Sequence, residues 1–258
     1  MTGFLVKKSF FDGWDNLIKM ALANLGFLAF LALAVFLPLA GEAVMGDWSL
    51  VLAVPGILCA FVYAGVIASV MKEASDYQSP GFRDLPAFLA RTWKASLIFG
   101  LINCAVLFLF TVAFPFYLSA GGIIGAVGAG VVFWMGFFWL LASQYFFPLL
   151  IRMGDPLPKV LKKCFIMILD NPGYSLFLLF WSALLLVLSV ATALLLPGLS
   201  GLLLWHQDAF KLRLYKYDWL EENPGRKPRE IPWDELLDRD RDAVGPRSLK
   251  GMIFPWKD

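Results

Sequence analysis

The stretch MALANLGFLAFLALAVFLPLA, residues 20–40, decides the fold. It contains no charged residue and exceeds the ~18 residues at which an apolar run becomes a candidate membrane-spanning helix. Lys7 and Lys8 precede it, as basic residues precede the apolar core of a secretory signal peptide. However, the run is longer than the roughly 7–15 apolar residues of a signal peptide, and no small-residue cleavage site follows it. We therefore expect it to be retained as a first transmembrane helix, over about residues 20–39, with Pro38 ending the helix.

Similar apolar runs recur along the chain, which is 59% hydrophobic and only 16% charged. A soluble domain typically carries about 25% charged residues. The runs predict an all-α, polytopic transmembrane helix bundle of six spans, arranged as three hairpins within residues 1–220. Amphipathic lead-in helices are expected before each hairpin. The five further spans are expected at about 50–71, 95–117, 126–151, 172–196 and 198–220.

Residues 221–258 form a polar tail of nearly balanced charge. We expect it to be cytoplasmic, with one short helix over about 232–242. The last residues, GMIFPWKD, are apolar enough to predict a docking peptide that packs under the bundle or on a partner.

The distribution of basic residues predicts the orientation. All 22 Lys and Arg residues precede span 1, lie between spans 2 and 3 or between spans 4 and 5, or follow the start of the last span. The intervening loops, 40–49, 118–125 and 197–201, contain none. Because basic residues near spans are retained in the cytoplasm, both termini are expected there, with an even number of crossings.

Small residues recur every four positions in span 2 and so form one narrow ridge on the helix. Such ridges let helix backbones approach closely in lipid. The ridge predicts either ordinary packing inside the bundle or a seam with a partner or a second copy. Its residues are Gly56, Ala60, Ala64 and Ala68.

The most polar segment within a predicted span is His206-Gln207-Asp208. In a helix that begins at Gly198, His206 would lie roughly 12 Å along the span, near the middle of a ~30 Å hydrocarbon core. One hypothesis is an intramembrane polar site. Its expected partners are Asn24, Asn103 and Gln144.

The alternative is that span 6 is short, tilted or re-entrant, and that this polar segment begins the cytoplasmic interface. The apolar stretch 174–205 is shorter than the ~40 residues that two full crossings need, which favours this alternative.

No motif predicts an enzyme. Spans 1 to 5 have no charged residue or His in their middle thirds, and the three cysteines lack metal-ligand spacing. We therefore expect no catalytic residue, cofactor or metal. The tail has no polybasic patch, so nucleic acid is not an expected partner. The expected surroundings are the lipid bilayer, with a membrane-protein partner or a second copy.

The stretch NLGFLAFLALAVFLPLAG, the small-residue span after it, FRDLPAFLARTWKASLIFGLIN and the Asn171-Pro172 helix start resemble the YesL-like family of small bacterial integral membrane proteins. The resemblance extends over the bundle but not the tail. It implies a multi-pass protein of the bacterial inner membrane with an accessory role in sugar uptake or sensing. It assigns no functional residues. We expect a non-enzymatic accessory or scaffold protein; the alternative is a small-solute permease or the substrate-binding subunit of a transporter.

Overall fold

The structure is a computed structural model that describes residues 1–79 and 81–247. In this part of the chain every regular element is helical. The long elements are α1 (Thr2–Asp15), α2 (Leu17–Met45), α3 (Ala53–Ser75), α4 (Leu85–Ala120), α5 (Gly122–Ser143), α6 (Phe146–Met153), α7 (Leu157–Asp170), α8 (Pro172–Ala191) and α9 (Gly198–Glu222). The shorter ones are η1 (Gly46–Leu52), η2 (Phe82–Asp84), η3 (Pro228–Glu230), α10 (Trp233–Leu236) and α11 (Asp238–Val244).

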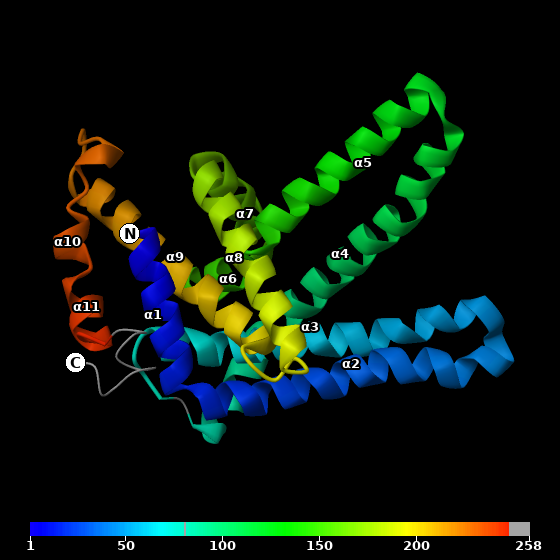
Figure 1. The fold of residues 1–258 in the computed structure, drawn as a ribbon, viewed down its shortest axis with the longest axis horizontal. Helices are drawn as coiled ribbons and strands as arrows, with labels where there is room; N and C mark the ends of the chain where they lie inside the picture. Colours follow the sequence, from blue (N-terminus) through cyan, green and yellow to red (C-terminus); the bar gives the residue numbers. More distant parts are fainter. Residues whose placement is uncertain (80, 248–258) are drawn as a thin grey trace.

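Two long helical hairpins extend from a common base (Figure 1). Helices α2 and α3 form one arm, joined by η1 at its far end, and α4 and α5 form the other. The arms pack together near the base, where a Cβ on Gly65 of α3 would lie 2.2 Å from the Ser96 hydroxyl of α4. Beyond the base the two arms diverge (Figure 1).

The third hairpin, α8 and α9, does not reach as far as the other two. Its connecting loop, 192–197, lies against Asn24 in the first third of α2, because the Asn24 amide donates to the carbonyls of Leu195 and Pro197 at 2.8 Å each. From Asn24 to the end of α2 at Met45 is about 30 Å at 1.5 Å per residue. The loop therefore lies one membrane thickness short of the far end of the α2–α3 arm.

Four helical stretches are long and apolar enough to cross a membrane: Leu17–Ser75, Leu85–Ala120, Gly122–Met153 and Pro172–Ala191. The first of these contains both α2 and α3. The expectation of an all-helical membrane protein is therefore confirmed. The expected sixth span, α9, is not among these stretches, so six crossings are not confirmed.

Several expected boundaries differ from the observed ones. The first span does not end at Pro38, which lies inside α2 and is buried. The lead-in predicted before span 3 is continuous with that span in α4, which also runs through Pro115. The tail has two short helices, α10 and α11, where one was expected. The predicted docking peptide, GMIFPWKD, lies outside the described residues.

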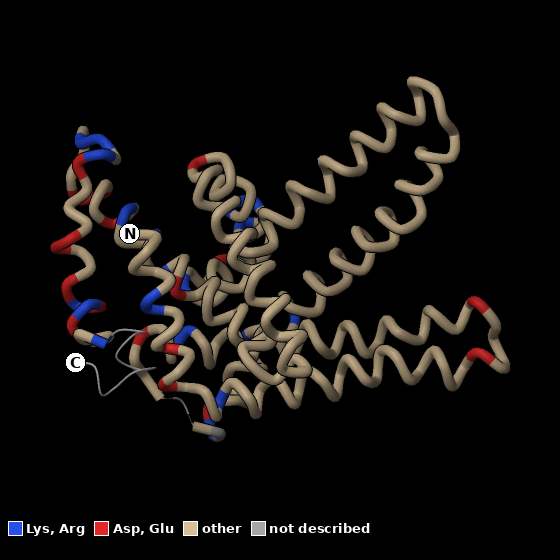
Figure 2. Tube along the Cα trace, viewed as in Figure 1, with Lys and Arg blue, Asp and Glu red and all other residues tan. Residues whose placement is uncertain are grey.

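The outer parts of the two arms carry no Lys or Arg (Figure 2). Lys and Arg lie where the arms meet and on α7, α9 and the tail, and the α4–α5 arm carries no charge beyond the base (Figure 2). The far end of the α2–α3 arm carries only acidic residues, Glu42 and Asp47. The base therefore presents the polar surface of the molecule, and the arms present apolar ones.

Candidate functional site

The polar residues predicted to share an intramembrane site do not meet. Asn24 is buried against the loop 192–197, where it also accepts a bond from the Ser200 amide at 2.9 Å. Asn103 accepts from the Trp139 indole at 3.1 Å and donates to its own helix. The Gln144 amide donates to the Ser175 carbonyl at 3.4 Å. Each polar group thus contacts a different element.

The tripeptide 206–208 also divides between different partners. His206 of α9 contacts the Ser182 hydroxyl of α8 at 3.0 Å. Gln207 donates to the Ala68 carbonyl of α3 at 3.3 Å and accepts from Arg152 Nε of α6 at 3.1 Å. Asp208 faces α1. Of the predicted site residues, only Gln207 and Asp208 belong to a larger polar cluster.

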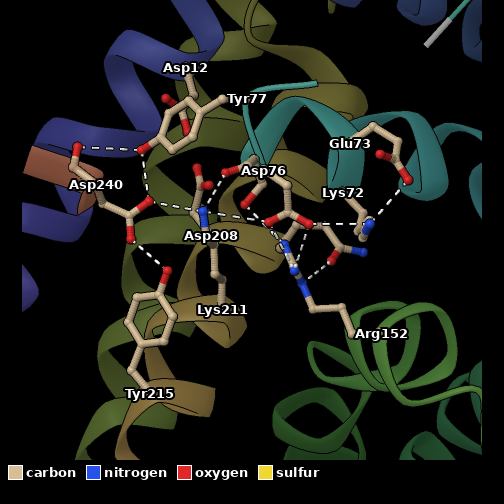
Figure 3. A network of polar contacts seen from close by, with 12 residues as sticks. Asp12, Lys72, Glu73, Asp76, Tyr77, Arg152, Asp208, Lys211, Tyr215 and Asp240 are labelled. Atoms are coloured by element: carbon tan, nitrogen blue, oxygen red, sulfur yellow. Dashed lines mark hydrogen bonds and ion pairs between the residues drawn. The ribbon is translucent and has the colours of Figure 1, made fainter. Parts of the chain in front are cut away.

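That cluster is the candidate functional site, and we call it the base cluster: Lys8, Asp12, Asp76, Tyr77, Arg152, Gln207, Asp208, Lys211, Tyr215 and Asp240 (Figure 3). Its members come from α1, the end of α3, α6, α9 and α11. It joins both ends of the described chain to the bundle.

Lys8 lies at the centre of the base cluster and is fully buried. Its ammonium pairs with Asp12 one turn along α1, lies 3.2 Å from Asp208 and 3.9 Å from Asp240. It also donates to the Ser75 carbonyl at 3.0 Å. The Lys8 ammonium therefore holds α1, α3, α9 and α11 around one positive charge.

The end of α3 attracts a second ammonium. Lys211 of α9 donates to the same Ser75 carbonyl at 2.9 Å and to Asp240 at 2.9 Å. The C-terminal end of a helix carries free carbonyls and partial negative charge, which favour cations. The ring of Tyr77 lies under both ammonium groups, with its centroid 4.3 Å from Lys8 and 4.7 Å from Lys211. The α3 terminus is therefore the anchor of the base cluster.

Asp240 joins the tail to this anchor. Its carboxylate accepts from the hydroxyls of Tyr77 and Tyr215 at 2.8 Å each, in addition to Lys211 (Figure 3). The carboxylate is fully buried. The neighbouring cations outweigh its burial, so that the pKa of Asp240 is held below its usual value. Helix α11 is thus held to the bundle by an ionised carboxylate.

The edge of the base cluster contains an arginine–carboxylate ion pair. Nη1 of Arg152 in α6 lies 3.1 Å from both oxygens of Asp76, and Nη2 donates to the Ser75 hydroxyl at 3.1 Å. Although burial opposes it, the pairing with Arg152 and Lys211 lowers the pKa of Asp76 below its usual value. Hydrogen bonds between charged groups of this kind are stronger than those between neutral groups.

The base cluster contains one more acid than base. The cations Lys8, Arg152 and Lys211 face the carboxylates Asp12, Asp76, Asp208 and Asp240. Burial and the neighbouring Asp208 carboxylate raise the pKa of Asp12 to about 8, against the opposing effect of Lys8. The folded protein therefore binds a proton at Asp12 more tightly than the unfolded chain does.

Asp208 is the least satisfied member of the base cluster. Both of its carboxylate oxygens are fully buried and accept no hydrogen bond in the described part of the chain, apart from the ionic contact with Lys8. Burying a carboxylate without hydrogen bonds is costly, so the contact with the Lys8 ammonium is needed to keep Asp208 in place.

A smaller polar cluster lies at the N-terminal end of α8 and joins it to α9. Lys216 of α9 donates to Asn171 at 2.9 Å and to Asp170 at 3.1 Å. The Asn171 amide donates to the Tyr217 hydroxyl at 2.6 Å. Pro172 opens α8 as expected, but the Asn171 side chain does not cap the helix and instead bonds across to α9.

The small-residue ridge of α3 serves packing inside the chain. A Cβ on Gly56 would lie 2.6 Å from the backbone nitrogen of Ala34 in α2, so the two helices touch through their backbones there. Ala64 and Ala68 are buried, and Ala60 is half-buried. Of the two readings, the described structure favours packing within the bundle over an exposed seam.

The sequence indicated the polar segment 206–208 but not the partners of Asp208. Lys8 and Asp12 lie one helical turn apart in a segment predicted to be amphipathic, and that spacing was the only local signal. Asp240 sits in a run of alternating charges typical of a solvated helix, so nothing in the sequence distinguishes it from its neighbours.

Two cavities of the described chain have apolar linings. One, of 780 Å³, lies between α1 and the α8–α9 hairpin. The other, of 1220 Å³, lies along α5 beside α7. Asn24, Asn103, Gln144 and His206 line neither of them. The described residues contain no group of three or more histidine, cysteine, aspartate or glutamate side chains that could hold a metal ion.

No protein-family model, no curated protein and no solved structure matches this chain.

Proposed function

We propose that this protein is a non-enzymatic membrane scaffold, an accessory subunit that holds a partner within the bilayer. The observation that carries the proposal is the dispersal of the intramembrane polar groups. Asn24, Asn103, Gln144 and His206 each bond to a different element. A permease would need such groups to line a common path, since polar residues inside a membrane usually mark the route of a solute or ion.

The apolar α4–α5 arm supports the same function. Beyond Lys94 its outer surface exposes large apolar side chains along both helices, and no charged residue occurs from there to the end of α5. A Cβ on Gly130 of α5 would meet no atom within 4 Å, so no other part of the described chain packs there. A glycine on a membrane helix allows a second helix to approach closely. The arm is therefore the surface that we assign to a membrane-embedded partner.

The proposed topology has four full crossings, by α2, α3, α4 and α5, with α8–α9 as a re-entrant hairpin. The contact of the loop 192–197 with Asn24 supports this in place of six crossings. Four crossings keep every Lys and Arg on one side as well as six do, and the positive-inside rule then puts both termini in the cytoplasm. A bacterial inner membrane is the location we propose.

Topology is tested with single cysteines and a membrane-impermeant thiol reagent, in a variant whose Cys59, Cys104 and Cys164 are replaced by serine. Cysteines introduced at Asp47 and Gly121 should react from outside intact cells. A cysteine at Ala193 should not. Labelling at Ala193 from outside would instead support a topology with six crossings.

The scaffold role is tested by photo-crosslinking in native membranes. A photoreactive residue at Val131, exposed on α5, should yield one defined protein adduct, whereas one at Ile18, exposed near the base, should yield lipid adducts. Proteoliposomes should show no protein-dependent swelling in small sugars. Swelling that is lost when Asn24 is replaced would instead favour the permease and contradict the scaffold.

The link to carbohydrate uptake rests on the resemblance to the YesL-like family alone. We propose it only through a partner: the adduct at Val131 would then be a subunit of a sugar transporter. The apolar lining of both large cavities gives no support to a sugar site in this chain itself.

A further inference from the structure

A groove of 780 Å³ runs between α1 and the tip of the α8–α9 hairpin. Its floor is formed by Met20, Leu185, Leu196 and Leu204, and its walls by aromatic rings that include Phe10, Trp14 and Trp181. Volumes of about 300–1,000 Å³ with mostly apolar walls are typical of ligand sites. The groove can therefore hold an apolar chain.

The charged groups at this groove are both basic. Lys7 and Arg247 are its only charged lining residues in the described chain. Lys7 donates to the Gly245 carbonyl at 3.1 Å and has no acidic partner among the described residues. Arg247 is ion-paired with Asp15 through Nη1 at 2.8 Å and donates from Nε to the Val244 carbonyl, and its Nη2 makes no hydrogen bond among the described residues. Lys7 is therefore the positive charge at the rim that lacks an acidic partner there, and it is complementary to an anion.

The groove lies at the depth of lipid headgroups. One face of α1 turns Lys8 and Asp12 into the base cluster, and another exposes Phe10 and Trp14. A helix with this division lies in the membrane interface, where indole rings are also favoured. Lys and Arg lie on this side of the molecule and not on the outer parts of the arms (Figure 2). An apolar groove with a basic rim at this depth matches a molecule with an acyl chain and an acidic headgroup.

We propose that the groove between α1 and α8–α9 binds one anionic phospholipid, with an acyl chain against Leu185 and Leu204 and the phosphate between Lys7 and Arg247. This binding site goes beyond the scaffold function and does not depend on the identity of a partner. Anionic lipids bind at basic pockets of this kind on the cytoplasmic side of membrane proteins.

The test uses the full-length protein in detergent and native mass spectrometry, with phosphatidylglycerol and phosphatidylcholine of identical acyl chains. We expect one retained phosphatidylglycerol, bound roughly tenfold or more tightly than phosphatidylcholine, since each basic group near a lipid surface contributes about 1 kcal/mol. Lys7→Gln combined with Arg247→Gln should abolish the preference. The matched control, Arg83→Gln with Lys94→Gln, removes two exposed cations outside the groove and should keep it.

A second variant tests the apolar part of the site. Leu188→Trp fills the groove and should weaken binding of both lipids, whereas Val187→Trp, on an exposed neighbouring position, should not. Circular dichroism and size-exclusion chromatography identify variants that fail to fold. Equal affinity for both lipids in the native protein, or an unchanged preference in the double glutamine variant, would overturn the proposal.

The remaining occupant to exclude is the end of the chain itself, because Arg247 lies at the rim and residues 248–258 follow it. Deletion of residues 248–258 should leave the phosphatidylglycerol preference unchanged. If lipid binds only to the shortened chain, the groove belongs to those residues and the lipid assignment is wrong.

Discussion

The Asp208 carboxylate of α9 lies 3.2 Å from the Lys8 ammonium of α1, and neither side chain has any exposed surface. This pair closes the base cluster, because Asp208 has no hydrogen-bond donor of its own in the described chain. The polar part of the packing of α1 on the bundle is therefore centred on one buried ammonium, that of Lys8.

Replacing Lys8 by Met should destabilise the protein strongly. The substitution keeps the length and the apolar stem but leaves Asp12, Asp208 and Asp240 without their shared cation. Removal of one partner from a buried ion pair typically costs about 3–5 kcal/mol. Thermal unfolding in detergent measures the loss. Asp208→Asn is the matched comparison: it removes the excess negative charge, and its loss should be clearly smaller. Equal losses in the two variants would contradict the central role of Lys8.

The stability of the α1 attachment should fall as the pH rises. The pKa of Asp12 is raised to about 8 in the folded protein, so the folded state holds a proton that the unfolded chain releases near the ordinary value of 3.8. The stabilisation is complete below pH 3.8 on this account and is lost as the pH rises toward 8. The slope is at most about 1.4 kcal/mol per pH unit, and it vanishes above pH 8.

Hydrogen exchange of the α1 amides between pH 5 and 9, corrected for the intrinsic exchange rate, checks this pH dependence. Asp76 and Asp240 have lowered pKa values, so their stabilisation is lost only as the pH falls below the ordinary range of carboxylates. They do not compete in this window. Asp12→Asn should give a flat profile; a profile that still slopes in this variant would assign the proton to another group.

Asn24→Ala should loosen the α8–α9 hairpin. The side chain donates to Leu195 and Pro197 and accepts from Ser200, and it is buried. Each lost hydrogen bond costs about 1 kcal/mol, and more where a buried partner is left unsatisfied, so a loss of about 2–4 kcal/mol is expected. Asn103→Ala, which removes one tertiary bond to Trp139, should cost about 1 kcal/mol. Comparable losses at both positions would show that the loop 192–197 is held by other contacts.

Gly56→Leu should separate α2 from α3. The Cβ of the added side chain would lie 2.6 Å from the backbone nitrogen of Ala34. This clash can be relieved only if α2 and α3 move apart. Overpacking of this kind costs about 1–3 kcal/mol. Gly130→Leu is the control, because nothing lies within 4 Å of its Cβ position. It should leave the thermal unfolding temperature unchanged while it weakens the photo-adduct expected at Val131.

The sequence predicted the helical class and the apolar segments well because both depend on local composition. Residues 20–40, 95–117 and 126–151 fall within α2, α4 and the α5–α6 stretch. The end of the first span was misplaced because proline was read as a helix stop, whereas Pro38 is accommodated inside α2. In lipid a proline within a helix is tolerated when neighbouring groups satisfy the freed carbonyl.

The candidate site was less predictable because it depends on contacts between distant segments. Depth along a helix suggested that His206 and Asp208 would share one environment, but His206 faces Ser182 and Asp208 faces Lys8. The shortness of the apolar stretch 174–205 raised the alternative of a short, tilted or re-entrant span 6, which stays a prediction. The partner of Asn24, a set of backbone groups at 195–200, has no side-chain signature and could not be read from the sequence.

The joining of α1 and α11 at the end of α3 has a consequence for biogenesis. Lys8 leaves the ribosome early, yet two of its carboxylate partners, Asp208 and Asp240, are translated only after all the apolar helices have been made. Until these residues are synthesised, α1 lies at the membrane–water interface and the Lys8 ammonium stays hydrated. Chains truncated before Asp208 should therefore insert the α2–α3 and α4–α5 arms but leave α1 accessible to protease. Formation of the base cluster is then the last step in the folding of the complete chain.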